Sequence, residues 1–142
     1  MNERMKILKE VAIKADLFRD ETKKLGEIAQ KAFTEQDKPG KHKSQLKGLE
    51  TIANSALKAS DVLDFIKRQT GRAKSDEGWK KQQFGQKLLA KIDPELKNNR
   101  NTICTQLNIS DEAQKLEVYL LLIREFIRQV VIHYEYKIGE TQ

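Results

Sequence analysis

The side chains best suited to bind phosphate are concentrated in the middle of this sequence of 142 residues. Residues 38–100 carry 15 basic and 7 acidic side chains, a net charge of +8, whereas residues 1–37 have a net charge of 0 and residues 101–142 one of −2. A localised excess of positive charge is typical of a surface that binds a polyanion. Its densest part is the segment 67–74, where four cations surround a glycine at the expected end of a helix. Arginine can form paired hydrogen bonds with phosphate there, and lysine supplies point charge.

An aromatic residue, Trp79, comes directly before the cations Lys80 and Lys81. Aromatic rings beside cations suit single-stranded nucleic acid, because its bases stack and its phosphates pair with positive charge. We therefore predict a nucleic-acid-binding surface that contains Lys41, Lys43, Lys67, Arg68, Arg72, Lys74, Trp79, Lys80 and Lys81. No helix-turn-helix or zinc-finger pattern is visible, so no sequence-specific recognition is predicted. The alternative interpretation is a solvated charged face with Trp79 in the core.

A second pair of residues that could do chemistry is Arg128 and His133, separated by four residues near the end of the chain. An Arg followed by four residues and a His, late in an all-helical domain, resembles the motif of the HEPN ribonucleases. The resemblance implies that the histidine acts as acid or base at a dimer cleft, and that the arginine stabilises charge on phosphate. The alternative is an arginine on a helix surface and a half-buried histidine.

The remaining reactive side chains predict neither a metal site nor a cofactor. The single cysteine, Cys104, excludes a disulfide within the chain, and only His42 and His133 could join it in a zinc site. Cys104 is interpreted as a small buried residue in a reducing compartment. Pairs of carboxylates such as Asp111 and Glu112 occur where helices are expected to begin, and there the helix dipole explains them.

The chain shows no sign of a membrane or secretory segment. The N-terminus lacks an apolar signal core, and the longest apolar run is 118–123, whereas a membrane span needs about 20 residues. We therefore expect a cytoplasmic protein.

The elements that must position these residues are predicted to be helices, because good helix formers dominate and there are only 7 Gly and 2 Pro. Apolar spacings of three and four, with capping residues, predict five helices. They cover about 3–34, 44–70, 75–92, 94–107 and 110–137. We expect one all-α domain, 1–142, folded as a bundle of about five helices with the second and last at its centre.

Two of these helices have specific patterns. The apolar stripe of the first begins with Met5, Leu8, Ala12, Ala15 and Phe18, and the helix is expected to bend or leave its partner in the polar stretch 19–24. The second has a regular stripe over its whole length and is expected to end at Gly71, a suitable C-terminal cap.

The last helix is apolar on several sides, which predicts either the spine of the bundle or an oligomer interface. Its residues 119–136 (YLLLIREFIRQVVIHYEY) resemble the closing segment of the small subunits of type III CRISPR effector complexes. The resemblance implies a non-catalytic subunit whose copies stack along a ribonucleoprotein. Their basic faces would line the channel for guide and target strands, which are read by shape and charge.

The sequence thus favours a non-enzymatic, basic helical subunit of a nucleoprotein complex. Its expected partners are RNA or single-stranded DNA, other protein subunits, and further copies of itself bound through the last helix. Two alternatives remain open. One is a HEPN-type ribonuclease that uses Arg128 and His133, and the other is an adaptor that binds proteins only.

Overall fold

The chain is all-helical, as predicted. A computed structural model describes residues 2–33, 43–74 and 77–141, and those ranges contain helices and turns but no strand. The α-helices are α1 (Glu3–Leu17), α2 (Arg19–Ala32), α3 (Lys43–Ser55), α4 (Ala59–Arg72), α5 (Phe84–Ala90), α6 (Lys97–Gln106) and α7 (Glu112–Thr141). A 3-10 segment, η1 (Gly78–Gln83), precedes α5, and a π segment, η2 (Lys91–Leu96), joins α5 to α6.

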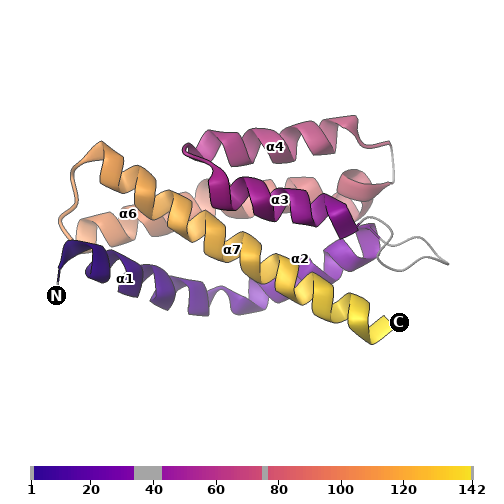
Figure 1. Ribbon diagram of the computed structural model, residues 1–142, viewed down its shortest axis with the longest axis horizontal. Helices are drawn as coiled ribbons and strands as arrows, with labels where there is room; N and C mark the ends of the chain where they lie inside the picture. The colour runs from indigo at the N-terminus through magenta and orange to yellow at the C-terminus, as the bar shows by residue number, and fades with distance from the viewer. Residues whose placement is uncertain (1, 34–42, 75–76, 142) are drawn as a thin grey trace.

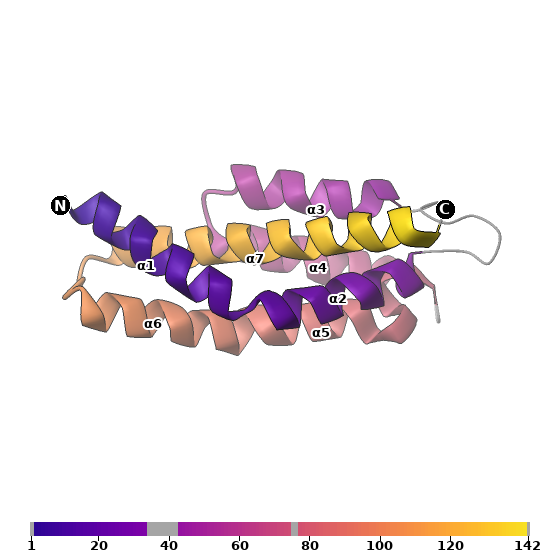
Figure 2. The same cartoon turned by 90° about the horizontal axis from the view of Figure 1, so that it is seen from below.

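The last helix, α7, is the spine of the bundle. Helices α1 and α2 lie along one side of it and α3 and α4 along the other, while α5 and α6 run behind in one line (Figures 1 and 2). Large α7 side chains such as Leu122, Phe126 and Tyr134 are almost completely buried. The wide apolar surface of this helix is therefore covered within one chain, and its breadth does not by itself require a second copy.

The first expected helix is two helices, and the beginning of its predicted apolar stripe is wrong, whereas Ala15 and Phe18 of that stripe are buried. The chain bends at Phe18, just before the polar stretch where a bend was expected. The buried residues of α1 are Ile7, Val11 and Ala15, whereas Met5 is 51% exposed and Leu8 37%. Both stripes have helical spacing, so spacing alone did not decide between them. The stripe that is buried begins with two β-branched residues, Ile7 and Val11.

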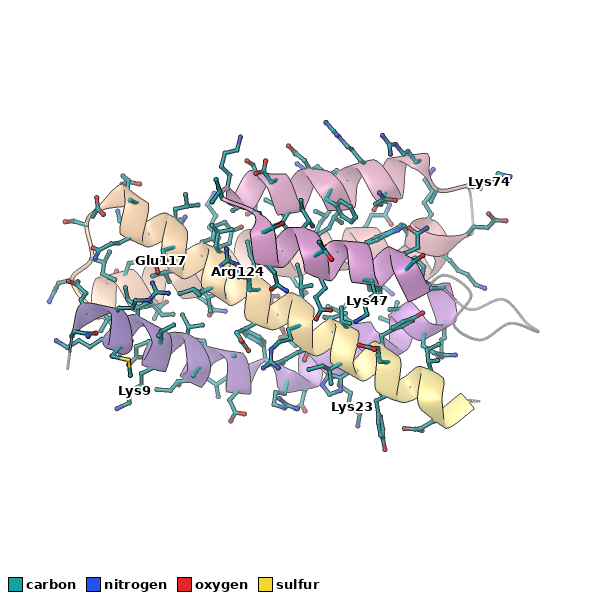
Figure 3. The ribbon with its side chains drawn as sticks, in the orientation of Figure 1. Lys9, Lys23, Lys47, Lys74, Glu117 and Arg124 are labelled. Atoms are coloured by element: carbon teal, nitrogen blue, oxygen red, sulfur yellow. The ribbon has the colours of Figure 1, made fainter. Side chains whose placement is uncertain are left out.

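The second expected helix is an antiparallel pair, α3 and α4, joined by a turn at residues 56–58 (Figure 1). No Gly or Pro marks this turn in the sequence. Instead, Arg124 of α7 donates hydrogen bonds from Nε to the Ala53 carbonyl (2.9 Å) and from Nη2 to the Ala56 carbonyl (3.2 Å) (Figure 3). The guanidinium satisfies carbonyl groups that a helix end leaves open, and its charge suits the negative end of the dipole.

Two glycines allow helices to approach closely. A Cβ on Gly26 of α2 would lie 2.6 Å from the His133 Cβ and 2.9 Å from the Tyr134 backbone nitrogen of α7. A Cβ on Gly85 of α5 would overlap Thr70 Oγ1 and lie 3.0 Å from Thr70 Cβ in α4. Gly71, by contrast, is not the cap that was expected, because α4 continues through it to Arg72.

Candidate nucleic-acid interface

Six of the predicted cations are gathered at one end of the bundle, where α4 ends, α3 begins and η1 follows (Figure 1). We call this group the basic end; its members are Lys67, Arg68, Arg72, Lys74, Lys80 and Lys81. The four on and beside α4 are exposed, and the two on η1 are half-buried. Lys74 points away from the end of α4 (Figure 3).

Within the part of the chain that the structure describes, no ion pair neutralises the charges of the basic end. Among the described residues, ion pairs form elsewhere, for example between Lys47 and Glu50 at 3.8 Å and between Lys91 and Glu95 at 3.2 Å. None of them involves a member of the basic end. Part of this charge complements the dipole of α4, whose C-terminus is negative. The dipole stabilises charges only near the last turn of α4, so it does not explain the positive charges of Lys80 and Lys81 on η1.

Two of the predicted binding residues are not tested by the structure. Lys41 lies outside the described residues, and for Lys43 only its place as the first residue of α3 is described.

Trp79 is a core residue, which contradicts its assignment as a base-stacking side chain. It is 2% exposed, and its indole nitrogen donates a hydrogen bond to Gln45 Oε1 at 3.0 Å. Its ring meets Phe33 edge-on, with centroids 5.3 Å apart, and lies 5.5 Å from Phe84. A ring enclosed in this way has no free face for a base, so the alternative interpretation of Trp79 is the correct one.

A different aromatic residue, Phe65 of α4, lies beside the arginines of the basic end. It is half-buried and lines a hollow of about 390 Å³ between α3 and α4, together with Ile52, Arg68 and Arg72. Arg72 also borders a second hollow, of about 250 Å³, next to Trp79. Phe65 was not singled out from the sequence, because no cation lies directly beside it in the way that Lys80 and Lys81 follow Trp79. The signal that could have identified it was the pair of arginines three and seven residues later, on the same face of the helix.

Arg128 and His133 do not face a common space within one chain. Five residues along an α-helix turn the direction of a side chain by about 140°. Arg128 is exposed and pairs with Glu125 at 3.1 Å, whereas His133 is half-buried against α2 beside Gly26. Gln129, one of the four residues between them in the sequence, is 3% exposed and forms hydrogen bonds with α1 and α2.

The surroundings of His133 favour its neutral form. Burial lowers the pKa of its imidazole below 6.5, and the positive charges of Arg19 and Lys23 lower it further, while Glu27 acts in the opposite direction. Within the described part of the chain, its buried Nε2 has no hydrogen-bond partner.

We expect the stability of the protein to fall when the pH is lowered through the range in which His133 titrates. Its folded pKa lies below the unfolded value, so the unfolded chain binds more protons. The stabilisation from neutral His133 is fully present above about pH 6.5 and is lost as the pH falls through the folded pKa. Urea unfolding at pH 7.5 and 5.5 measures the loss, which His133→Gln should reduce and His42→Gln should leave intact. An equal loss in His133→Gln would contradict this assignment.

The other reactive groups of the described residues do not form a site. No three of the described His, Cys, Asp and Glu side chains lie close enough together to hold a metal ion. Cys104 is 5% exposed, and burial raises the pKa of its thiol, which agrees with its interpretation as a buried residue. Within the same ranges, no helix is long and apolar enough to cross a membrane.

When this chain is compared with known proteins, no family model, no curated protein and no solved structure matches it.

Proposed function

We propose that this chain is a non-catalytic helical subunit of a nucleoprotein complex in the cytoplasm, and that it binds the backbone of single-stranded nucleic acid through the basic end. One observation carries the proposal. Six cations lie at one end of the bundle, on α4, just after it and on η1, and none is paired with an acidic group among the described residues. Folding gains nothing from such mutual repulsion, whereas binding phosphate relieves it.

The contacts expected of the cations of the basic end are with phosphate and not with the bases. Long lysine side chains and exposed arginines adapt to a flexible backbone, and each neutralised phosphate releases condensed counterion. The contribution of these charges to affinity is similar for unrelated sequences and depends strongly on salt.

A small subunit of a type III CRISPR effector complex is the most specific form of this proposal. It is supported by the resemblance of the last helix and by an all-helical, basic chain. Such a subunit also needs surfaces for other proteins, including further copies. The large apolar side chains that α7 leaves exposed for such contacts are Leu116, at 36%, Ile132, at 44%, and Tyr136, at 69%.

The test is a comparison of two double variants in binding to several unrelated single-stranded RNAs. We expect Arg68→Ala/Arg72→Ala to weaken all of them by similar factors, each roughly tenfold at low salt, because two phosphate contacts are lost. The control is Lys6→Ala/Lys9→Ala on α1, which removes the same charge; Lys9 lies at the opposite end of the molecule from Lys74 (Figure 3). Equal weakening by both variants would show that net charge, and not the basic end, governs binding.

A further inference from the structure

The hollow between α3 and α4 is lined by apolar side chains and by charged side chains of both signs. The apolar side chains are those of Ile52 and Phe65. Along α4, Asp61 and Asp64 lie at one end and Arg68 and Arg72 at the other. They share a face because they are separated by three, four or seven residues. A ligand that fits must therefore combine a flat apolar part, a group that donates hydrogen bonds and an anionic group.

The ring of Phe65, which lines this hollow, is packed against two other elements. It meets Trp79 edge-on, with centroids 6.3 Å apart. Helix α3 also comes close to the ring at Gly48, where a Cβ would lie 3.4 Å from Phe65 Cζ. A ring packed in this way has little freedom left to lose when a flat ligand packs against it.

The two carboxylates differ in their availability. Asp61 pairs with Lys58 at 3.8 Å. Asp64 is exposed and, among the described residues, has no ion-pair partner. A free carboxylate accepts hydrogen bonds from an amino group and repels a carbonyl oxygen. This one therefore favours a ligand with an exposed amino group.

We propose that this hollow binds one nucleotide of a single strand and prefers a base that carries an exocyclic amino group. The base packs against Phe65 and Ile52, its amino group donates to Asp64, and the adjacent phosphate binds Arg68 and Arg72. The inference rests on the proposed function and adds to it a base preference. Each contact has a known chemical basis: aromatic packing for the base, carboxylate for the cytosine amino group and guanidinium for phosphate.

The sharpest test compares oligocytidine with oligouridine of equal length, about 12 nucleotides. Cytosine carries an amino group where uracil carries a carbonyl oxygen. We expect the wild type to bind oligocytidine about fivefold more tightly. Asp64→Asn should bring the ratio close to 1, because an amide can also donate to the uracil carbonyl. The control, Asp20→Asn on α2, changes net charge by the same amount and should keep the ratio.

Further outcomes distinguish a failure of the base site from a failure of the proposed function. Arg68→Ala/Arg72→Ala should weaken binding of both oligonucleotides and keep their ratio. Equal binding of both by the wild type, or an unchanged ratio in Asp64→Asn, would overturn the base site while the proposed function stands. A wild-type protein that binds neither would overturn both. Phe65→Leu should weaken both several-fold, and its thermal unfolding, measured in parallel, identifies any loss caused by packing against Trp79.

Discussion

Replacing Gly26 by alanine is expected to destabilise the protein by about 3 kcal/mol, near the upper end of overpacking effects. The added Cβ would lie 2.6 Å from the His133 Cβ and 2.9 Å from the Tyr134 backbone nitrogen. One of these atoms belongs to the main chain of the spine, so no side-chain rotation relieves the overlap. Helices α2 and α7 would have to separate. Urea unfolding followed by circular dichroism measures the change.

The matched control is the same substitution at Gly71, another helical glycine. Nothing lies within 4 Å of a Cβ built there. Gly71→Ala should therefore stabilise the protein by about 0.5 kcal/mol, because alanine loses less backbone entropy in a helix. Opposite signs for the two substitutions are the expected result. If Gly26→Ala were as harmless as Gly71→Ala, α2 would not pack on α7 at this distance.

Gln129→Leu is expected to lower the free energy of unfolding by about 2–3 kcal/mol, because the buried Ala15 carbonyl loses the hydrogen bond that Gln129 donates to it. Gln129 Nε2 donates to the Ala15 carbonyl at 2.9 Å, and its Oε1 lies 2.8 Å from Thr22 Oγ1. Gln129 is 3% exposed and Thr22 fully buried, so water cannot replace these bonds. The amide thus ties α7 to both helices that meet at Phe18. Thermal and urea unfolding measure the cost.

A double-mutant cycle with Thr22→Val isolates this network. The Thr22 hydroxyl also lies 2.9 Å from the Arg19 carbonyl, so it keeps one acceptor when Gln129 is lost. We expect the cost of Thr22→Val/Gln129→Leu to be less than the sum of the two single costs. Strict additivity would contradict a direct bond between the two side chains.

The starts of helices were easier to predict than their ends. The last helix begins where expected, and Asp111 Oδ2 accepts a hydrogen bond from the Gln114 backbone nitrogen at 3.2 Å, a local interaction that the sequence encodes. The turn between α3 and α4 was missed, because Arg124 caps it from a helix about 70 residues away. This turn is stabilised by a tertiary contact, so the residues of the turn itself do not indicate it.

The sequence identified the cations of the candidate site but not its aromatic residue. Cations near one another in sequence, at the end of one helix, stay near one another after folding, so the basic end could be recognised. Trp79 and Phe65 could not be distinguished by sequence. Trp79 is buried in the core, where it contacts Phe33 and Phe84, whereas Phe65 lines the hollow between α3 and α4.

The salt dependence of binding is the most direct test of the central claim that the basic end binds phosphate. Affinity for a single strand is measured at several salt concentrations for the wild type, for Arg68→Ala/Arg72→Ala and for Lys6→Ala/Lys9→Ala. If both arginines contact phosphate, the slope of log affinity against log salt should flatten by about 0.7 per contact, or roughly 1.4 in the first variant, and stay unchanged in the second. A full wild-type slope in Arg68→Ala/Arg72→Ala would contradict the claim, because the arginines would then belong to a solvated face.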